Sequence, residues 1–413
     1  MWPFDCELRD VTEAKLRALI PNISECQTLD YKERIDDDSE EKWKQSILKD
    51  IAAMANASGG YLVIGMAEDR NADDGTPGEL VGIADGDKWA GRIKDVYLDG
   101  IEPRIVGLDI NAVRHEIVED TPCHTLVVHV PPSGNKPHMI SHRGRQLFYK
   151  RHGRTNTRMD IEEIRDAVVA SNESRHRVAA FKKERRSEME RVAGGDAPTF
   201  LFMYASPLMI GDERLDTSAQ PIREFLNVVM NWAGRVGQQV YAWHPEPTLG
   251  GVEQVSQSEA VAIQRNGFFD FASWMVGDRS KDAPIIYESN IVPLVYWWTA
   301  ATWEFSRRIL DGEPLLLGVE LCNALDTGIY RRMQRVPGRS ARTNLIAPPA
   351  FRCAGRSAFF NATRHICDRI YNAYGIERCP FINPDGQLAT IRDGGSCDPH
   401  HPISWPTNDN SEQ

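Results

Sequence analysis

A helical pattern that ends in two glycines and leads directly into an unbroken apolar run dictates the type of fold open to this chain. The helix is expected to begin at Asp38 or Ser39, and its apolar residues recur three or four positions apart: Trp43, Ile47, Ile51 and Met54. After Gly59 and Gly60, the run Tyr61–Met66 is typical of a strand buried on both faces. A tight helix-to-strand connection of this kind indicates a layered α/β domain.

Residues 1–165 are predicted to form this mixed α/β domain. Thr12 is expected to cap a short helix, and Asp160 to open a later one. Further strands are predicted at Thr28–Lys32, around Ile105–Ile110, and at Thr125–Val130 and Gln146–Lys150.

The remainder of the chain is predicted to hold a charged helical linker at 166–197, an α+β domain at 198–383 and a loosely ordered tail at 384–413. In the second domain we expect a strand at Phe200–Met203 and helices at Ile222–Trp232 and Ile291–Leu310. Seven of the ten tryptophans lie beyond residue 230, which indicates either a large aromatic core or an aromatic-lined pocket.

The apolar pattern argues against a membrane protein. The longest apolar stretch, Ile291–Trp303, is only 13 residues long and contains Pro293. Roughly 18 residues are needed to span a bilayer. The first residues show no signal-peptide pattern, and the eight cysteines form no CxxC pair, so a reduced, cytoplasmic protein is expected.

The charge is distributed unevenly along an acidic chain. The net charge is −11, yet residues 142–191 carry 14 Lys and Arg against 8 Asp and Glu. Residues 1–141 carry 15 against 27. A basic segment on an acidic body can attract phosphate, although a solvated helix face would have the same composition.

Asp30 and Lys32 are the first candidates for chemistry. In a strand they point to the same face, and a carboxylate beside a lysine suits phosphodiester chemistry. Glu25 lies five residues upstream, and Glu68 and Asp69 follow the buried apolar run. Neighbouring strands would bring these carboxylates together around a metal ion. The alternatives are a surface ion pair at Asp30 and Lys32 and an acidic loop at 68–74.

Two strings of sequence indicate a family. ECQTLDYKE at 25–33 and IAAMANASGGYLVIGM at 51–66 resemble the AlbA-like (AlbA_2) domain of the Schlafen family, which shows Glu-x4-Glu-Phe-Lys and then Ala-Asn-x-x-Gly-Gly-x-Leu-x-Ile-Gly-Val with acids after it. FYKRHG at 148–153 is similar to the closing strand and turn of that domain. The resemblance covers residues 22–165, so residues 199–413 lie outside it.

The resemblance implies a metal-dependent endoribonuclease that acts on tRNA-like, structured RNA. Its three carboxylates would be Glu25, Asp30 and Glu68, holding Mg²⁺ or Mn²⁺, and Lys32 would offset phosphate charge. Asp30 stands where the family has Glu. Ala67 stands where an acid is common, so either Glu68 or Asp69 can be the third carboxylate.

The basic residues expected to hold the nucleic-acid backbone are Lys150, Arg151, Arg154 and Arg158. Because Phe148 and Lys150 share one face of a strand while Tyr149 and Arg151 share the other, one aromatic side chain is expected in the core. Gly59 and Gly60 could approach a nucleotide phosphate, but the chain has no nucleotide-binding glycine motif and a helix-ending turn is favoured.

The residues and the resemblance together predict an endoribonuclease in a bacterial defence or stress response. Long Schlafen proteins present two such lobes and this chain has one, so the resemblance also implies a homodimer that completes an RNA groove. The rival is a DNA-binding transcriptional regulator that uses the same domain without cleavage. A third possibility is a nucleotide-sensing protein whose aromatic second half is the working site.

Overall fold

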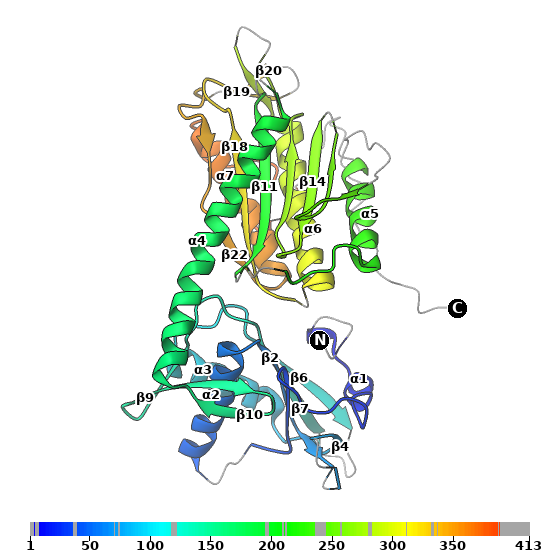
Figure 1. The fold of residues 1–413 in the computed structure, drawn as a ribbon, viewed down its shortest axis with the longest axis vertical. Coiled ribbons are helices and arrows are strands. Elements are labelled where there is room, and N and C mark those ends of the chain that lie inside the picture. The colour runs from blue at the N-terminus through cyan, green and yellow to red at the C-terminus, as the bar shows by residue number, and fades with distance from the viewer. Residues whose placement is uncertain are drawn as a thin grey trace, which may run out of the picture. The chain divides into compact units, whose positions relative to one another are not determined.

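The computed structural model is mixed α/β and divides into two compact units (Figure 1). The first comprises Met1–Val178 with Asp311–Pro314, and the second comprises Ala179–Leu310 with Leu315–Gln413. The structure describes residues 4, 8–35, 39–69, 71–72, 75–116, 122–194, 198–208, 210, 213–235, 245–256, 258–279, 283–310, 312–331, 334–336, 338–386 and 388. Most of the tail predicted at 384–413 therefore lies outside the described residues.

A four-stranded sheet in the order β1-β2-β7-β6 forms the centre of the first unit. Its strands are β1 (Leu29–Lys32), β2 (Gly60–Ile64), β6 (Asp109–Glu116) and β7 (Pro122–Val130). β1 and β2 run parallel, and the other neighbours run antiparallel. Parallel strands need a crossover connection, which helix α2 (Glu40–Asn56) supplies here.

Both faces of this sheet are covered. The covering elements are η1 (Leu8–Asp10), α1 (Glu13–Arg17), α2 and α3 (Gly86–Gly100). Leu62 and Ile64 pack with α2 and α3 on one face, whereas Tyr61 and Val63 pack with the N-terminal elements on the other. This double coverage explains why β2 is buried along its whole length and why its sequence is continuously apolar.

A second sheet of the first unit lies against α2. Its order is β10-β9-β8-β5, and all its neighbours are antiparallel. The strands are β5 (Ile101–Glu102), β8 (Met139–His142), β9 (Arg145–His152) and β10 (Thr155–Arg158). β9 runs along α2, so this strand and this helix together position the side chains of the candidate site.

Helix α4 (Ile161–Val192) connects the two units as one continuous helix. It begins where the Asp160 carboxylate accepts hydrogen bonds from the backbone N–H groups of Glu162 and Glu163, at 2.9 and 2.8 Å. The helix start predicted at Asp160 is confirmed. The basic residues at 175–191 belong to this helix.

The second unit is built on an eight-stranded sheet in the order β12-β13-β14-β15-β11-β18-β21, with β22 also paired to β18. The strands are β12 (Glu246–Pro247), β13 (Gly251–Val255), β14 (Glu259–Gln264), β15 (Phe269–Ser273), β11 (Phe200–Pro207), β18 (Leu315–Cys322), β21 (Leu345–Ile346) and β22 (Phe351–Cys353). β11 is central and wholly buried. A smaller sheet contains β16 (Gly277–Asp278), β17 (Ile285–Tyr287), β19 (Gly328–Arg331) and β20 (Gln334–Arg335).

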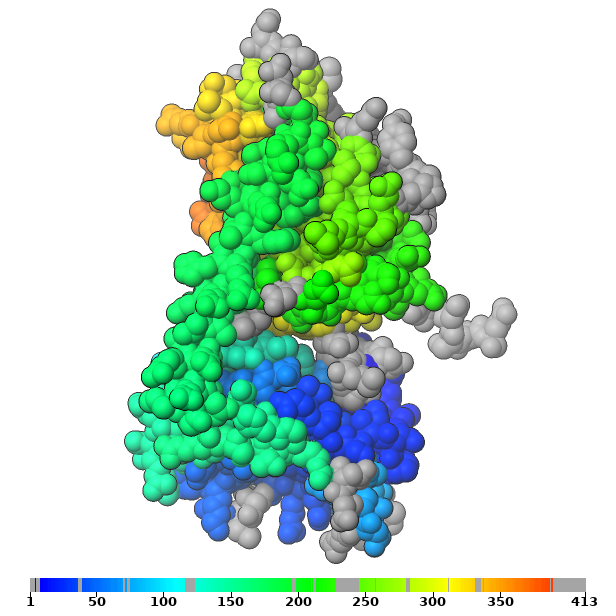
Figure 2. Space-filling view, viewed as in Figure 1, coloured from blue at the N-terminus to red at the C-terminus, as the bar shows by residue number. Residues whose placement is uncertain are grey.

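Alternate residues of β11 face different helices. Leu201 and Met203 pack with α5 (Gln220–Arg235), α6 (Glu288–Ile309) and α7 (Arg356–Ala373). The opposite face of the sheet carries the later turns of α4, whose Arg185 and Lys182 bond acidic side chains of β15 and β18. Figure 2 shows these turns of α4 on the outside of the unit.

The tryptophan-rich region is a core rather than a pocket wall. Trp297 and Trp298 of α6 are fully buried among the aromatic side chains of the large sheet, including Phe269 and Phe271. Of the two interpretations that the tryptophan distribution left open, the described residues support the aromatic core.

Two strand predictions were wrong. The single strand predicted at Tyr61–Met66 breaks at Gly65, whose φ of +105° turns the chain from β2 into the separate β3 (Met66–Glu68), which pairs with β4 (Pro77–Leu80). The strand predicted around Ile105–Ile110 begins only at Asp109. Sequence reasoning also missed α3.

In the ranges described above, no helix combines the length and the apolar character that crossing a membrane requires.

Candidate functional site

The parallel pairing of β1 with β2 places Asp30 and Lys32 beside α2. Their backbones pair with Leu62 and Ile64, whose side chains pack against that helix. Leu29 and Tyr31 face the other way, into the core beneath α1. The period of two therefore separates the chemical face of β1 from its structural face, as the sequence predicted.

Lys32 is held between two carboxylates. Its Nζ lies 3.0 Å from Asp50 Oδ2 and 3.7 Å from Asp30 Oδ2. Burial alone would lower the pKa of Lys32, but Asp50 and Asp30 together raise it above its ordinary value. The ammonium group is thus kept charged and fixed in position, with about a quarter of the side chain open to solvent.

Arg151 of β9 binds the other oxygen of Asp30. Its Nη1 lies 2.9 Å from Asp30 Oδ1, and its Nε and Nη2 donate to the backbone carbonyls of Cys26 and Leu29, at 3.1 and 3.0 Å. The side chain has no exposed surface. This placement differs from the phosphate contact expected of Arg151, because its guanidinium is taken up by β1, the segment before it and, at 3.4 Å, Asn156 Oδ1.

Glu25 lies close to the same carboxylates. One oxygen accepts a 2.7 Å hydrogen bond from the backbone N–H of Tyr31. Burial, followed by the negative charges of Asp30 and Glu68, raises the pKa of Glu25 to about 7, against the lowering effects of the Tyr31 hydrogen bond and of Arg151. Glu25, Asp30 and Glu68 therefore interact electrostatically, and we call these three residues the acidic cluster.

The two candidates for the third carboxylate differ in their surroundings. Glu68, at the end of β3, is exposed and acts on Glu25. The Asp69 side chain instead accepts hydrogen bonds from the backbone and the side chain of Asn71, at 2.9 and 3.2 Å. The geometry favours Glu68, because Asp69 is engaged in the turn that follows β3.

The acidic cluster as arranged does not fit a bound metal ion. Carboxylate oxygens are the ligands that Mg²⁺ prefers. Within the described parts of the chain, however, no three His, Cys, Asp or Glu side chains are close enough to share a cation. The physical reason is local: both oxygens of Asp30 face positive side chains, Arg151 and Lys32.

The remaining basic residues lie on the surface. Lys150 Nζ is 3.5 Å from Glu163 Oε1, while Arg154 and Arg158 are exposed. The side chains of Arg154 and Glu25 both lie against Gly75. A Cβ on this glycine would stand 2.8 Å from Glu25 Cγ and 2.9 Å from Arg154 Nη1. Of the residues predicted to hold the nucleic-acid backbone, Arg154 thus lies beside the acidic cluster.

The Gly59–Gly60 turn serves the fold. The Gly59 N–H donates to the Met54 carbonyl at 2.9 Å, as at the end of a helix. A Cβ on Gly60 would stand 2.4 Å from the backbone oxygen of Thr28. The glycines let β1 approach β2, which supports the helix-ending turn over a nucleotide loop.

Sequence reasoning missed two members of the site, Asp50 and Asn156. Asp50 is 2% exposed, and Asn156 Nδ2 donates to its Oδ1 at 2.7 Å. A signal for Asp50 was present, since a charged residue three positions after Ile47 falls within the apolar stripe of α2. Asn156 carried no such signal, because its partner lies 106 residues away in sequence.

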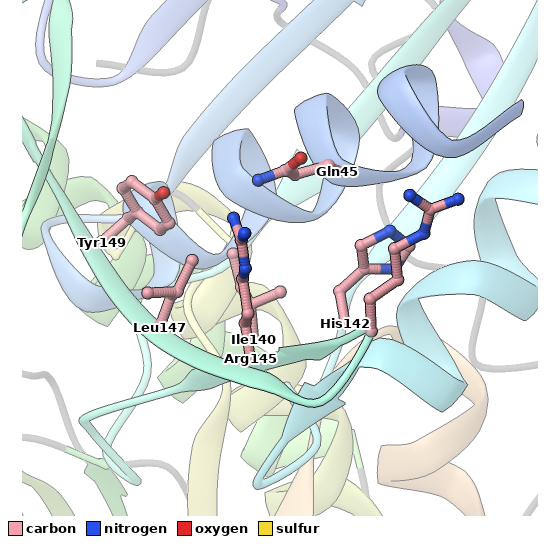
Figure 3. A pocket seen from close by; sticks show the side chains of 7 residues that line it. Gln45, Ile140, His142, Arg145, Leu147 and Tyr149 are labelled. Carbon is pink, nitrogen blue, oxygen red and sulfur yellow. The ribbon is translucent and has the colours of Figure 1, made fainter. Parts of the chain in front are cut away.

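A pocket lies between α2 and the β8–β9 hairpin, also within the first unit (Figure 3). Its volume is about 320 Å³, and it is lined by Gln45, Ile140, His142, Arg143, Arg145, Leu147 and Tyr149. Strand β9 and helix α2 also carry Arg151, which binds Asp30, and Asp50, which binds Lys32, so the pocket uses other residues of the same two elements.

One family model matches part of the first unit. The Schlafen AlbA_2 family model matches residues 25–160. No curated protein matches the chain.

Two solved structures are similar to parts of the chain. The N-terminal domain of a RecG-related protein from Nitrosomonas europaea is 21% identical, with a TM-score of 0.25, over 35% of this chain and 89% of that one. The DIP2311 protein from Corynebacterium diphtheriae is 16% identical, also with a TM-score of 0.25, over 55% of this chain and 34% of that one. This chain therefore spans about a third of the second protein.

The family match begins at Glu25 and ends at Asp160, so it includes β1, the α2 crossover, β2 and the β9 strand that contributes Arg151. These are the elements that build the acidic cluster and its partners. Residues 25–160 of this chain are a Schlafen AlbA_2 domain.

Proposed function

We propose that this chain is an endoribonuclease that cleaves structured, tRNA-like RNA at the acidic cluster. The observation that carries the proposal is the position of Glu25, which lies within electrostatic reach of Asp30, Glu68, Lys32 and Arg151, with the exposed Arg154 nearby. Like charges crowded together in this way cost stability, and such arrangements occur at functional sites more often than elsewhere. The Schlafen family, which includes endoribonucleases, supports the same assignment.

Lys32 is the residue best placed to stabilise a reacting phosphate. Asp50 and Asp30 hold its ammonium group charged and oriented, while part of the side chain stays open to solvent. A cation fixed before the reaction stabilises the charge that develops on phosphate without reorganising. Arg151 does not face the phosphate. It binds Asp30 and so helps to keep Lys32 in position.

The basic surface residues would hold the RNA backbone. Arg154 lies beside Glu25, and Lys150 and Arg158 lie on β9 and β10 of the neighbouring sheet. Arginine binds phosphate with two parallel hydrogen bonds, which sets the register of the backbone. Dependence on Mg²⁺ or Mn²⁺ stays a prediction, and the present arrangement assigns no step to a metal ion.

The test is cleavage of labelled total tRNA by the full-length protein, run separately with Mg²⁺, Mn²⁺ and EDTA. Glu68→Gln is the first variant, because Glu68 is exposed and its loss leaves no buried charge unpaired. Glu79→Gln is its matched control: it lies opposite Ala67 on the paired strand β4 and is also exposed. We expect Glu68→Gln to lower the cleavage rate at least about 100-fold, and Glu79→Gln to leave it unchanged.

An Asp30→Ala variant is a poorer choice, since it would leave the buried Arg151 without its carboxylate and so disturb the fold. Intact tRNA under all three conditions, with a folded protein, would contradict the proposal. Equal loss of cleavage in Glu68→Gln and Glu79→Gln would show that the acidic cluster is not the site of cleavage.

A second candidate, a DNA-binding regulator, is favoured by one observation. Asp30 is already neutralised by Arg151 and Lys32, as in a structural ion pair. A regulator would bind duplex DNA with an affinity that falls steeply with salt, would cut nothing, and would keep its affinity in Glu68→Gln. The same preparations, assayed with duplex DNA at several salt concentrations, decide between the two.

We also propose that the protein acts as a homodimer, whose two AlbA_2 domains would together make a longer RNA-binding surface. Light scattering behind a sizing column measures the molar mass directly. A mass near twice 46.5 kDa is expected, and 46.5 kDa at assay concentration would contradict the dimer.

A further inference from the structure

The pocket between α2 and the β8–β9 hairpin has two chemically different ends. Arg145, Leu147 and Tyr149 occupy every second position of β9, so their side chains lie on one face of the strand, the face that lines the pocket. Ile140 pairs with Leu147 from β8 and extends the apolar wall. Figure 3 shows Arg145 and Tyr149 reaching from the strand toward the helix that carries Gln45.

The other end of the pocket is basic. His142 Nε2 and Arg143 Nε lie 2.9 and 2.8 Å from the same oxygen of Glu41, which fixes both side chains at the tip of the hairpin. Arg145 is exposed, and its side chain takes part in no ion pair or hydrogen bond with the described residues. Two guanidinium groups against one carboxylate leave this end positive, so it attracts an anion.

Gln45 completes the lining with a primary amide, which offers both a donor and an acceptor. An aromatic ring, an amide and a guanidinium around one space suit a ligand that has a flat ring with polar edges and a nearby anion. The volume of about 320 Å³ lies at the lower end of the roughly 300–1,000 Å³ typical of small-ligand sites.

We propose that this pocket binds one nucleotide unit, with its base against Tyr149, the edge of the base at Gln45 and its phosphate at Arg145. The unit comes either from a single-stranded stretch of RNA or from a free mononucleotide. In the first case the proposal rests on the proposed function and adds a subsite to it. A base inside a duplex is excluded, because stacked neighbours would prevent its entry.

Strand β9 connects this pocket to the acidic cluster. Tyr149 and Arg151 are two residues apart on the same face, which corresponds to about 7 Å along an extended strand. Arg151 holds Asp30, whereas Tyr149 lines the pocket. A nucleotide in the pocket would therefore direct the neighbouring phosphodiester toward Asp30 and Lys32.

The binding test uses full-length protein in EDTA, with AMP, GMP, CMP and UMP in calorimetry, and with a labelled eight-nucleotide single-stranded RNA and its duplex in anisotropy. Arg145→Gln removes the guanidinium at an exposed position, and Arg114→Gln is the matched control, an exposed arginine on strand β6 of the same unit. Tyr149→Leu removes the ring, and Tyr149→Phe keeps it.

We expect Arg145→Gln and Tyr149→Leu to weaken binding at least about tenfold, in line with the contribution of base stacking, while Tyr149→Phe and Arg114→Gln change it less than about twofold. Because Arg145 is exposed, its variant remains informative even if Tyr149→Leu fails to fold. Binding of mononucleotides, or of single-stranded RNA alone, identifies the source of the unit.

Two further outcomes separate this proposal from the proposed function. Mononucleotide binding that Arg145→Gln weakens, without any RNA cleavage, supports the pocket and overturns the nuclease. RNA cleavage that Arg145→Gln leaves unchanged, with no nucleotide binding, overturns the pocket and keeps the nuclease. Equal losses in Arg145→Gln and Arg114→Gln also overturn the pocket, because they indicate general charge attraction.

Discussion

Arg151 and Asp30 form a buried ion pair, 2.9 Å between Nη1 and Oδ1, that ties the closing strand β9 to the first strand β1. The two residues are far apart in sequence and belong to different sheets. The pair therefore does two things: it fixes the mutual position of the sheets, and it orients the carboxylate that helps to hold Lys32.

Replacing Arg151 with Met should destabilise the first unit by about 3–5 kcal/mol, because it leaves a buried carboxylate without its main partner. Arg158→Met, at an exposed position of the adjacent strand, should cost less than about 0.5 kcal/mol. Urea unfolding, combined with hydrogen exchange of peptides from β1 and β9, measures both. Equal stability of the two variants would show that the pair contributes little.

The elements that could be predicted from sequence are those whose burial is periodic. The stripe of Trp43, Ile47 and Ile51 predicted α2, and the uninterrupted apolar run predicted β2. α3 was missed, although its buried residues include Ile93 and Tyr97. These two residues are four positions apart, and an apolar pattern this short is hard to recognise among polar neighbours.

The candidate site was predictable only in part, for a similar reason. Asp30 and Lys32 lie on one strand, so their shared face follows from the period of two. Whether Arg151 binds phosphate or Asp30 depends on how β9 packs against α2 and β1. This packing is a long-range contact, and no local sequence pattern indicates it. Exposed and buried arginines look alike in sequence.

Gly59 should tolerate no side chain. Its φ is +74°, and a Cβ would stand 2.5 Å from the backbone nitrogen of Pro132. Gly144 has a similar φ of +71° with open space around it, so Gly144→Ala isolates the backbone strain, about 1–2 kcal/mol. Gly59→Ala should cost at least about 2 kcal/mol more in urea unfolding. Similar losses in both would mean that the turn can yield to the added carbon.

The first unit should lose stability in mild acid because of His138. The side chain is fully buried, and burial lowers its pKa to about 4, although Nδ1 lies 2.6 Å from the Pro103 carbonyl oxygen. The unfolded chain binds a proton near pH 6.5 and the folded one near 4, so stability falls as the pH drops through this window, by about 3 kcal/mol in total. His138→Gln should flatten the fall, as measured by exchange of β8 peptides between pH 4 and 7. An unchanged slope would assign the acid sensitivity to other groups.

The second unit should respond to pH in the opposite direction, through Glu259 of β14. This side chain is 6% exposed, its Oε1 has no hydrogen-bond partner among the described residues, and burial raises its pKa to about 7. The folded protein keeps the proton up to pH 7, whereas the unfolded chain releases it near 4.5, so stability is greatest below 4.5 and falls as the pH rises to 7. The full loss is about 3 kcal/mol. Glu259→Gln, which stays neutral, should remove this slope in urea unfolding followed by tryptophan emission, since Trp297 and Trp298 report on this unit. A slope that persists in Glu259→Gln would show that the carboxyl group ionises without cost, for example by turning toward solvent.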